Sequence, residues 1–227
     1  MDKTNKTNKT NKINKINKIG VFGGTFNPVH KGHEISAIGF YDKFALGKLL
    51  IIPANIPPHK PNYDGASARD RLEMCRICFD KYNKSGYNIE VSDAEIKKDG
   101  VSYTIDTIGA LREIYPAGSS VIYFLVGSDM FLYLEQWREY KKLLEMCVFA
   151  VAFRKTSAAD AAETLELRER LINRGYKIEL LENSALEISS TELREKLKRG
   201  AGAGYLREYL SPEVLNYIKE RNIYVLQ

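Results

Sequence analysis

The sequence predicts an α/β fold in which a parallel sheet is covered by helices on both faces. Short apolar runs of strand character alternate with segments of helical periodicity along most of the chain. Parallel strands need crossover connections, and those crossovers bury both faces of the sheet. The length of 227 residues and the hydrophobic fraction of 44% suit a globular chain with a sizeable core. We therefore expect a Rossmann-like sheet with additional C-terminal helices.

Six segments are predicted strands. They lie at 18–22 (KIGVF), 48–53 (KLLIIP), 87–92 (YNIEVS), 120–127 (SVIYFLVG), 147–153 (CVFAVAF) and 176–182 (YKIELLE). In an open parallel sheet, ligands bind beyond the carboxyl ends of the strands, where the strand order reverses. The loops after residues 22, 53, 127 and 153 are therefore where a site is expected.

Helices are predicted between these strands and after the last of them. The five between strands lie near 33–46, 67–82, 104–115, 138–146 and 157–174. A further helix begins at Ser189, where Glu192 has the capping-box spacing and Gly200 marks the end. The last begins after Ser211, with Pro212 at its first position. The polarity of these two helices suits lids or flanks rather than strands of the sheet.

The first 17 residues differ from the rest in composition. They form a polar three-residue repeat with five lysines and one aspartate, so they carry +4 of the net charge of +5. We expect a disordered tail over 1–17 and a single domain over 18–227. The remaining charge of +1 argues against a nucleic-acid partner. The sequence also has no apolar run of the ~20 residues that span a membrane and no signal-peptide core, which predicts a cytoplasmic protein.

The three cysteines are predicted to be buried thiols rather than a functional site. Cys75 and Cys78 lie in a C-x-x-C, but the surrounding pattern is helical, with Ser67 as a cap, and both thiols fall on its apolar face. Cys147 leaves an odd number, which argues against a disulfide framework. A zinc site would need further ligands that the neighbouring sequence does not supply.

The stretch GVFGGTFNPVHKGH, residues 20–33, follows the first strand and is the strongest candidate for chemistry. Gly23 and Gly24 let backbone N–H groups approach an anion, and the next helix directs its partial positive end to the same place. The stretch is neither a G-x-G-x-x-G fingerprint nor a P-loop. For the glycine pair alone, a plain tight turn is the simpler interpretation.

Histidines favour an anion site at this edge. His30 and His33, with a glycine between them, can direct two imidazole donors to one point. His59 and Lys60 follow the second strand in a proline-rich loop, at the same predicted edge. The spacing is not that of a zinc motif. The alternatives without chemistry are that a histidine is structural and that the proline-rich loop is a rigid turn with Lys60 exposed to solvent.

Several motifs in order carry a resemblance to a known family. The pair GGTFNPVHKGH and ISSTELR resembles the signatures of the nucleotidyltransferase superfamily with an H-x-G-H motif. PPHK, SYTIDT (102–107) and FLVGSDMFLYLEQW (124–137) are similar to the bacterial nicotinate mononucleotide adenylyltransferases. The resemblance runs from about residue 18 to the C-terminus. It implies transfer of AMP from ATP to nicotinate mononucleotide, by direct in-line displacement of pyrophosphate, in NAD biosynthesis.

The resemblance also implies roles for individual residues. The catalytic group would be His30, His33 and Arg194, and the ATP-binding group would be Gly23, Gly24, Thr25, Phe26, Ser189, Ser190 and Thr191. The mononucleotide-binding group would be Asn55, Lys60, Thr104, Gly127, Asp129 and Trp137, with Trp137 stacking on the pyridine ring. Mg²⁺ would bind through the ATP phosphates, with no metal site formed by the protein itself. The partners would be the two substrates, with neither nucleic acid nor membrane, and the resemblance leaves an oligomer open.

Three positions depart from the family pattern, and two other functions remain open. Asn27 stands where Asp is frequent, Arg138 follows the tryptophan where an aromatic residue is frequent, and FRKTS, which contains Arg154, replaces Arg-Pro-Gly. These positions bear on base recognition rather than on reaction class.

One alternative is adenylyl or cytidylyl transfer to another phosphorylated acceptor such as phosphopantetheine. The other is a regulatory module that binds a nucleotide without catalysis.

Overall fold

The computed structural model describes residues 17–58, 65–98, 100–153, 158–182 and 189–224. The predicted tail lies outside this part, apart from Asn17, and so do His59, Lys60 and Arg154. Asn17 is the first residue of the first strand, where its N–H donates to the Ser119 carbonyl at 3.1 Å. The first strand therefore begins at Asn17, one residue before its predicted start at residue 18.

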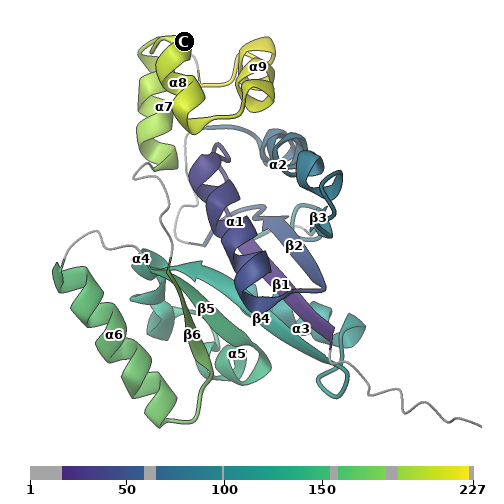
Figure 1. The fold of residues 1–227 in the computed structure, drawn as a ribbon, viewed down its shortest axis with the longest axis vertical. Helices are drawn as coiled ribbons and strands as arrows, with labels where there is room; N and C mark the ends of the chain where they lie inside the picture. The colour runs from purple at the N-terminus through teal and green to yellow at the C-terminus, as the bar shows by residue number, and fades with distance from the viewer. Residues whose placement is uncertain (1–16, 59–64, 99, 154–157, 183–188, 225–227) are drawn as a thin grey trace, which may run out of the picture.

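The centre of the molecule is a six-stranded parallel sheet with the order β3-β2-β1-β4-β5-β6 (Figure 1). Its strands are β1 (Asn17–Gly24), β2 (Lys48–Pro53), β3 (Ile89–Val91), β4 (Ser120–Gly127), β5 (Val148–Phe153) and β6 (Ile178–Glu182). The chain moves outward from β1 to β3 on one side and from β4 to β6 on the other. The order therefore reverses between β1 and β4, and the expected ligand edge is where these two strands end.

Helices cover both faces of the sheet (Figure 1). One face packs against α1 (Lys31–Phe44) and α2 (Ala68–Asn83), and the core on this side continues into α7 (Ser190–Lys198), α8 (Ala203–Tyr209) and α9 (Pro212–Glu220), which lie beyond the sheet at the top of the view in Figure 1. The other packs against α3 (Thr104–Ile114), α4 (Ser128–Phe131), η1 (Leu134–Gln136), α5 (Tyr140–Met146) and α6 (Ala158–Asn173). This confirms the predicted fold class.

Successive residues of a strand belong to opposite cores. In β2, Leu49 and Ile51 pack on the α1 side, whereas Leu50 and Ile52 pack on the α3 side. The alternation follows from the two-residue period of a strand, and burial of both faces explains the unbroken apolar runs. Every helix in the described part of the chain is too short or too polar to cross a bilayer.

The predicted elements are present, with some corrections. Each predicted strand is found within two residues at its amino end, and Ser67, Ser189 and Ser211 cap α2, α7 and α9 as expected. The helix predicted at 138–146 begins only at Tyr140, because Glu139 has a left-handed backbone with φ of 52°. Helices α4, η1 and α8 were not predicted. They are one or two turns long, and burial of Leu134 and Leu206 stabilises segments too short to show periodicity.

The predicted burial of the cysteines is confirmed. Cys75, Cys78 and Cys147 are buried free thiols. Burial raises the pKa of all three, to about 12 for Cys147.

Candidate active site

The loop after β1 lies at the carboxyl edge of the sheet, beside the point where strand order reverses. Gly23 and Gly24 end the strand and pair with Ile52 and Pro53 of β2. Phe26, two residues after Gly24, is buried and has a backbone φ of 50°, in the left-handed region that bulky residues rarely adopt. A Cβ on Gly24 would lie 3.1 Å from the Phe26 ring. The glycine therefore leaves room for a strained, tightly packed turn.

The two histidines lie at the N-terminus of α1. His30 is its N-cap and is 3% exposed, and the ring centroids of His30 and His33 are 3.8 Å apart. The His33 Nδ1 accepts the backbone N–H of His30 at 3.2 Å. With Nδ1 an acceptor, the proton of the neutral His33 ring resides on Nε2, which makes that atom a donor. The pair lies at the positive end of a 14-residue helix, where negative charge is stabilised.

The second motif folds directly onto this loop. The Ser190 Oγ donates to the Pro28 carbonyl at 3.0 Å, and the Arg194 Nη1 donates to the Asn27 carbonyl at 2.8 Å. The Arg194 Nη2 also donates to the Thr191 Oγ1 at 3.2 Å. The structure therefore brings together the two segments that carry the resemblance, although more than 160 residues separate them.

Asn27 joins three distant parts of the chain. Its Oδ1 accepts from the Ala66 N–H at 3.1 Å and from the Tyr224 hydroxyl at 2.5 Å. A Cβ on Gly65 would lie 2.2 Å from the Asn27 Nδ2, so this position has no room for a side chain. Tyr224 did not emerge from the sequence, because a contact across 197 residues leaves no local pattern.

The loop after β2 is attached to its surroundings through Asn55 and a buried arginine. The Asn55 side chain donates to the carbonyls of Lys98 and Gly100, at 3.0 and 3.4 Å, and its N–H donates to the Ser102 Oγ at 2.9 Å. Arg71 of α2 donates to the Asn55 carbonyl at 2.9 Å. The predicted binding residue Asn55 thus ties the loop to the segment before α3. Lys60 lies outside the described residues.

The remaining predicted residues lie at the starts of α3 and α4 and after η1. Thr104 is the first residue of α3, and Gly127 ends β4. A Cβ on Gly127 would lie 2.4 Å from the Asp129 Oδ1, so the glycine makes room for that carboxylate. Trp137 packs edge-on against Phe124, with ring centroids 6.1 Å apart.

Trp137 and Arg138 have different surroundings. The Trp137 Nε1 is buried without a hydrogen-bond partner among the described residues. The Arg138 guanidinium lies 4.9 Å from the centre of the Tyr103 ring and 3.8 Å from the Asp106 carboxylate. Arg138 is therefore beside the N-terminus of α3, where the predicted residue Thr104 lies.

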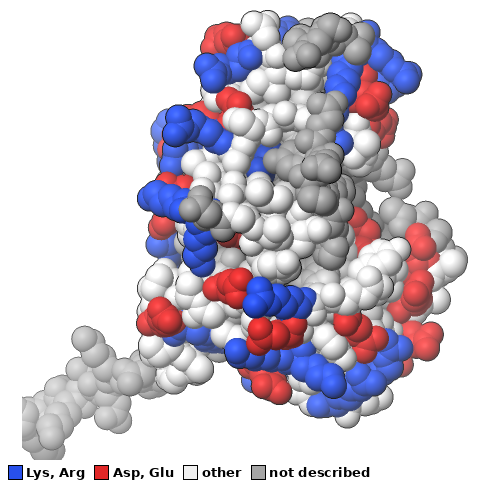
Figure 2. Space-filling view, turned by 180° about the vertical axis from the view of Figure 1, so that it is seen from behind, with Lys and Arg blue, Asp and Glu red and all other residues white. Residues whose placement is uncertain are grey.

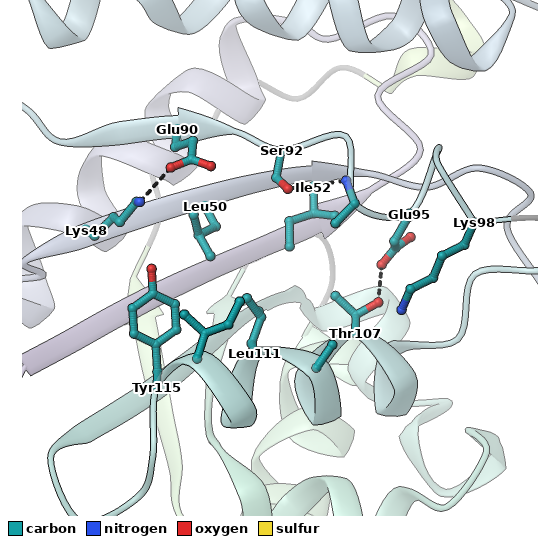
Figure 3. Close-up of a pocket in the computed structure, with 13 residues that line it drawn as sticks. Lys48, Leu50, Ile52, Glu90, Ser92, Glu95, Lys98, Thr107, Leu111 and Tyr115 are labelled. Atoms are coloured by element: carbon teal, nitrogen blue, oxygen red, sulfur yellow. Dashed lines mark hydrogen bonds and ion pairs between the residues drawn. The ribbon is translucent and has the colours of Figure 1, made fainter.

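A cavity of about 170 Å³ between α3 and strands β2 and β3 is separate from these residues (Figure 3). Its lining is mainly apolar and contains none of the predicted site residues. A Lys48–Glu90 ion pair of 2.5 Å lies at one end, and a 2.6 Å hydrogen bond from Thr107 to Glu95 lies at the other. The bond to Glu90 raises the pKa of Lys48. We do not assign the site to this cavity, because none of the predicted site residues lines it and four of its polar side chains pair with one another.

Comparison with known proteins identifies the class. The family model described as cytidylyltransferase-like matches residues 21–196, which include the histidine loop and the α7 segment. The solved Plasmodium falciparum nicotinic acid mononucleotide adenylyltransferase complexed with NaAD has a TM-score of 0.73 at 20% identity, over 92% of this chain and 97% of that one. That likeness shows a shared fold.

Curated relatives narrow the class further. Two of them are named "Probable nicotinate-nucleotide adenylyltransferase". The relative from Desulfatibacillum aliphaticivorans is 34% identical over 91% of this chain and 99% of the relative. The relative from Gloeobacter violaceus is 39% identical over 90% of this chain and 95% of the relative. The chain belongs to the nicotinate-nucleotide adenylyltransferases, a family of nucleotidyltransferase enzymes. This confirms the family expected from the motifs.

Proposed function

We propose that the protein transfers the adenylyl group of ATP to nicotinate mononucleotide, forming nicotinate adenine dinucleotide and pyrophosphate, in NAD biosynthesis. One observation carries the proposal at the level of this chain. The histidine loop and the start of α7, which are the two signature segments, are joined through Asn27, Pro28, Ser190 and Arg194 at the reversal point of the sheet. The names of the curated relatives point to the same reaction.

The ATP side would be formed by two helix N-termini that face one loop. His30 and His33 would donate to the triphosphate from the start of α1, and Ser189, Ser190 and Thr191 would offer donors from the start of α7. Arg194 would add a positive charge beside the same loop, where its bond to the Asn27 carbonyl restricts its position. Gly23, Gly24, Thr25 and Phe26 would line the approach of the nucleotide.

The mononucleotide side would lie across the edge, between the β2 loop and α3. Asn55, Lys60, Thr104, Gly127, Asp129 and Trp137 would contribute to it. Donors at the α3 N-terminus suit a carboxylate, whereas the amide of nicotinamide mononucleotide brings donors of its own. Arg138 lies beside that terminus and adds a positive charge. We therefore propose that the acid is preferred over the amide.

In the reaction, a phosphate oxygen of the mononucleotide attacks the α-phosphorus of ATP in line with the bond to the bridging oxygen. That P–O bond breaks as the new one forms, and pyrophosphate leaves with the bonding electron pair. The protein aligns two anions and stabilises the charge that develops on the α-phosphate and the leaving group. The donor on His33 Nε2 and the Arg194 guanidinium suit this role.

Mg²⁺ would be bound through the ATP phosphates, where it supplies neutralisation of the developing negative charge. The described residues contain no cluster of three or more His, Cys, Asp or Glu side chains that could enclose a metal ion. Mg²⁺ commonly binds through substrate phosphates and waters with few protein ligands, so the residues present are compatible with this mode.

The proposed setting is the cytoplasm, with the two substrates as partners. In the view of Figure 2, basic and acidic side chains are interspersed around a mostly uncharged middle, rather than gathered in one basic patch. With a net charge of +1 outside residues 1–17, this favours small anionic substrates over nucleic acid.

The test is to incubate the purified protein with ATP, Mg²⁺ and phosphorylated acceptors, and to identify products by mass. The acceptors are nicotinate mononucleotide, nicotinamide mononucleotide and phosphopantetheine. We expect nicotinate adenine dinucleotide and pyrophosphate, with kcat/KM for the acid exceeding that for the amide by orders of magnitude. Product only with phosphopantetheine would support the first alternative, and nucleotide binding without any product would support the second.

A variant pair tests the acid preference separately. Arg138→Gln should raise KM for the acid and leave that for the amide nearly unchanged, because only the acid carries the extra negative charge. Lys142→Gln is the control, since Lys142 is an exposed cation one turn further on that pairs with Glu139 at 3.2 Å. Equal kcat/KM for acid and amide in the wild-type enzyme would refute the preference.

A further inference from the structure

Arg71 is a fully buried arginine that connects the two loops of the candidate site. It lies on α2 with 0% exposure. Its Nη1 donates to the Thr25 carbonyl at 2.8 Å, and its Nη2 donates to the Asn55 carbonyl at 2.9 Å. Thr25 belongs to the loop after β1, and Asn55 belongs to the loop after β2. We call these two hydrogen bonds the Arg71 bridge.

The chemistry of the bridge explains why the residue is an arginine. A guanidinium is planar and rigid, so two of its nitrogens maintain two acceptors at a defined separation. A lysine has one nitrogen on a flexible stem and cannot fix both carbonyls in the same way. Burying a cation is unfavourable, and such groups can often be replaced by apolar residues without loss of stability. The bridge is therefore better explained by the geometry that it imposes than by its contribution to the free energy of unfolding.

The two carbonyls belong to loops that are assigned to different substrates. Thr25 is five residues before His30, in the loop assigned to ATP. Asn55 is in the loop assigned to the mononucleotide, and this loop is fixed from its other side by the Ser102 Oγ and the Lys98 carbonyl. The bridge therefore joins the loop assigned to ATP to the loop assigned to the mononucleotide.

We propose that Arg71 is a positioning residue that sets the separation of the two substrates. The inference rests on the proposed function. Each loop keeps its own contacts when the bridge is lost, so each substrate still binds. The alignment between the two substrates is lost, and a misplacement of about 1 Å between reacting groups can lower the rate by ~10²-fold.

The chain contains a matched control at the opposite edge of the sheet. Arg112 also donates to backbone carbonyls, at 2.8 Å from its Nε to Met146 and at 3.2 Å from its Nη1 to Tyr115 and Ser120. Ser120 is the first residue of β4, so this arginine joins segments at the amino edge, away from the candidate site. Substitutions of Arg71 and Arg112 therefore remove the same kind of bond at opposite ends of the sheet.

The experiment compares Arg71→Lys with Arg112→Lys, at a temperature where both are folded. For each variant, kcat is measured with both substrates, and Kd is measured separately for ATP and for nicotinate mononucleotide. For Arg71→Lys we expect kcat to fall by ~10²-fold while both Kd values stay within about threefold of wild type. For Arg112→Lys we expect a lower melting temperature with kcat and Kd nearly unchanged.

Two outcomes would overturn the inference. If Arg71→Lys keeps the wild-type kcat, the bridge does not position the substrates. If it weakens binding of both substrates as strongly as it lowers kcat, the residue maintains the local fold rather than the alignment. A wild-type protein that yields no dinucleotide would instead refute the proposed function.

Hydrogen exchange provides a readout that does not depend on activity. In Arg71→Lys, the backbone amides of residues 24–27 and 54–56 should exchange faster than in wild type. In Arg112→Lys, the amides of residues 115 and 117–120 should exchange faster instead. Unchanged exchange in the two site loops would also overturn the inference. If Arg71→Lys does not fold, Arg71→Met decides the question, because an apolar side chain of similar length avoids a buried unpaired charge and still removes both hydrogen bonds of the bridge. That variant should also lower kcat by ~10²-fold with both Kd values retained, and a wild-type kcat would overturn the inference.

Discussion

His33 has two roles, and a substitution such as His33→Ala would remove both of them at once. Its Nδ1 accepts the His30 N–H and so caps α1, and its Nε2 is the proposed donor to the triphosphate. The two nitrogens can be separated by choosing the replacement. The amide oxygen of asparagine is attached to Cγ, as Nδ1 is, whereas the amide nitrogen of glutamine is attached to Cδ and extends toward the position of Nε2.

We predict that His33→Asn retains the cap but loses the donor. The melting temperature should stay near that of wild type, and kcat should fall ~10²–10³-fold with little change in Kd for ATP, as for loss of one transition-state donor. His33→Ala should lose both, with an additional destabilisation of ~1 kcal/mol from the missing cap. His33→Gln should recover part of kcat. An asparagine variant with kcat within a few-fold of wild type would contradict the proposed role.

The buried cysteines predict how stability depends on pH. Burial raises the pKa of Cys147 to about 12, and its thiol donates to the Leu143 carbonyl at 3.4 Å. Above about pH 8.5 the unfolded chain releases this proton and the folded protein keeps it. The unfolded state then binds fewer protons, so stability decreases as pH rises from there toward 12. Below pH 8.5 this contribution is complete.

The measurement is the free energy of unfolding in urea from pH 7 to pH 10.5. We expect the free energy of unfolding to decline above pH 8.5. In Cys147→Ala this decline should be shallower by ~1.4 kcal/mol per pH unit, which is the slope that one proton contributes. An identical decline in the variant would show that other groups cause it. In the native protein at pH 8, all three thiols should also resist alkylation.

Among the elements, β1 and α1 approach each other at Gly20. A Cβ there would lie 2.4 Å from the Leu46 Cδ1 and 2.9 Å from the Phe40 Cε1, both in the core under α1. The close approach brings α1 down onto the strand whose carboxyl end leads to the histidines. The glycine at position 20 is therefore required by packing, and the ones at 24 and 65 by the loop.

We predict that Gly20→Ala lowers the free energy of unfolding by ~1–3 kcal/mol, as overpacking of a core does. Gly39→Ala is the matched control, because Gly39 lies in α1 with nothing within 4 Å of an added Cβ. It should stabilise the protein by ~0.5–1 kcal/mol through helix propensity. Denaturant titrations of both variants provide the measurement. A Gly20→Ala protein as stable as the Gly39→Ala protein would refute the packing argument.

At the scale of the whole molecule, the C-terminal segment packs against α2 and contacts the histidine loop. Leu193, Leu206, Leu210, Val214, Leu215 and Ile218 join the core that contains Met74 and Cys75 of α2. Beyond α9, the Tyr224 hydroxyl reaches the Asn27 side chain in the histidine loop. The C-terminal segment is therefore part of the candidate site as well as of the core.

We predict that the N-terminal segment contributes little to folding or activity. Residues 1–16 are a polar repeat with little to bury, so their deletion should leave the melting temperature and kcat/KM unchanged. Removing Asn17 as well should lower the melting temperature, because it pairs with Ser120 in the sheet and its N–H donates to the Ser119 carbonyl. A large loss of stability on deleting 1–16 alone would contradict this prediction.

Local patterns in the sequence determined the six strands, most helices, the burial of the cysteines and the family. Buried strands leave apolar runs, helix caps leave a serine or proline at a set spacing, and the histidine motif is contiguous. The family resemblance that the motifs carry implied most of the proposed site residues. The local patterns missed the short helices α4, η1 and α8, because one or two turns carry no measurable period.

Only the tertiary structure decided which distant residues support the site. In the sequence, nothing distinguishes Arg71 from the other polar residues of its helix. In the structure, its guanidinium joins the carbonyls of two loops. Tyr224 and Arg194 reach Asn27 from 197 and 167 residues away. The side chain of Asn55, which is predicted to bind the mononucleotide, also donates to the carbonyls of Lys98 and Gly100. Hydrogen bonds to backbone carbonyls depend on position and not on the partner's side chain, so no pattern of residue types in the sequence could reveal them.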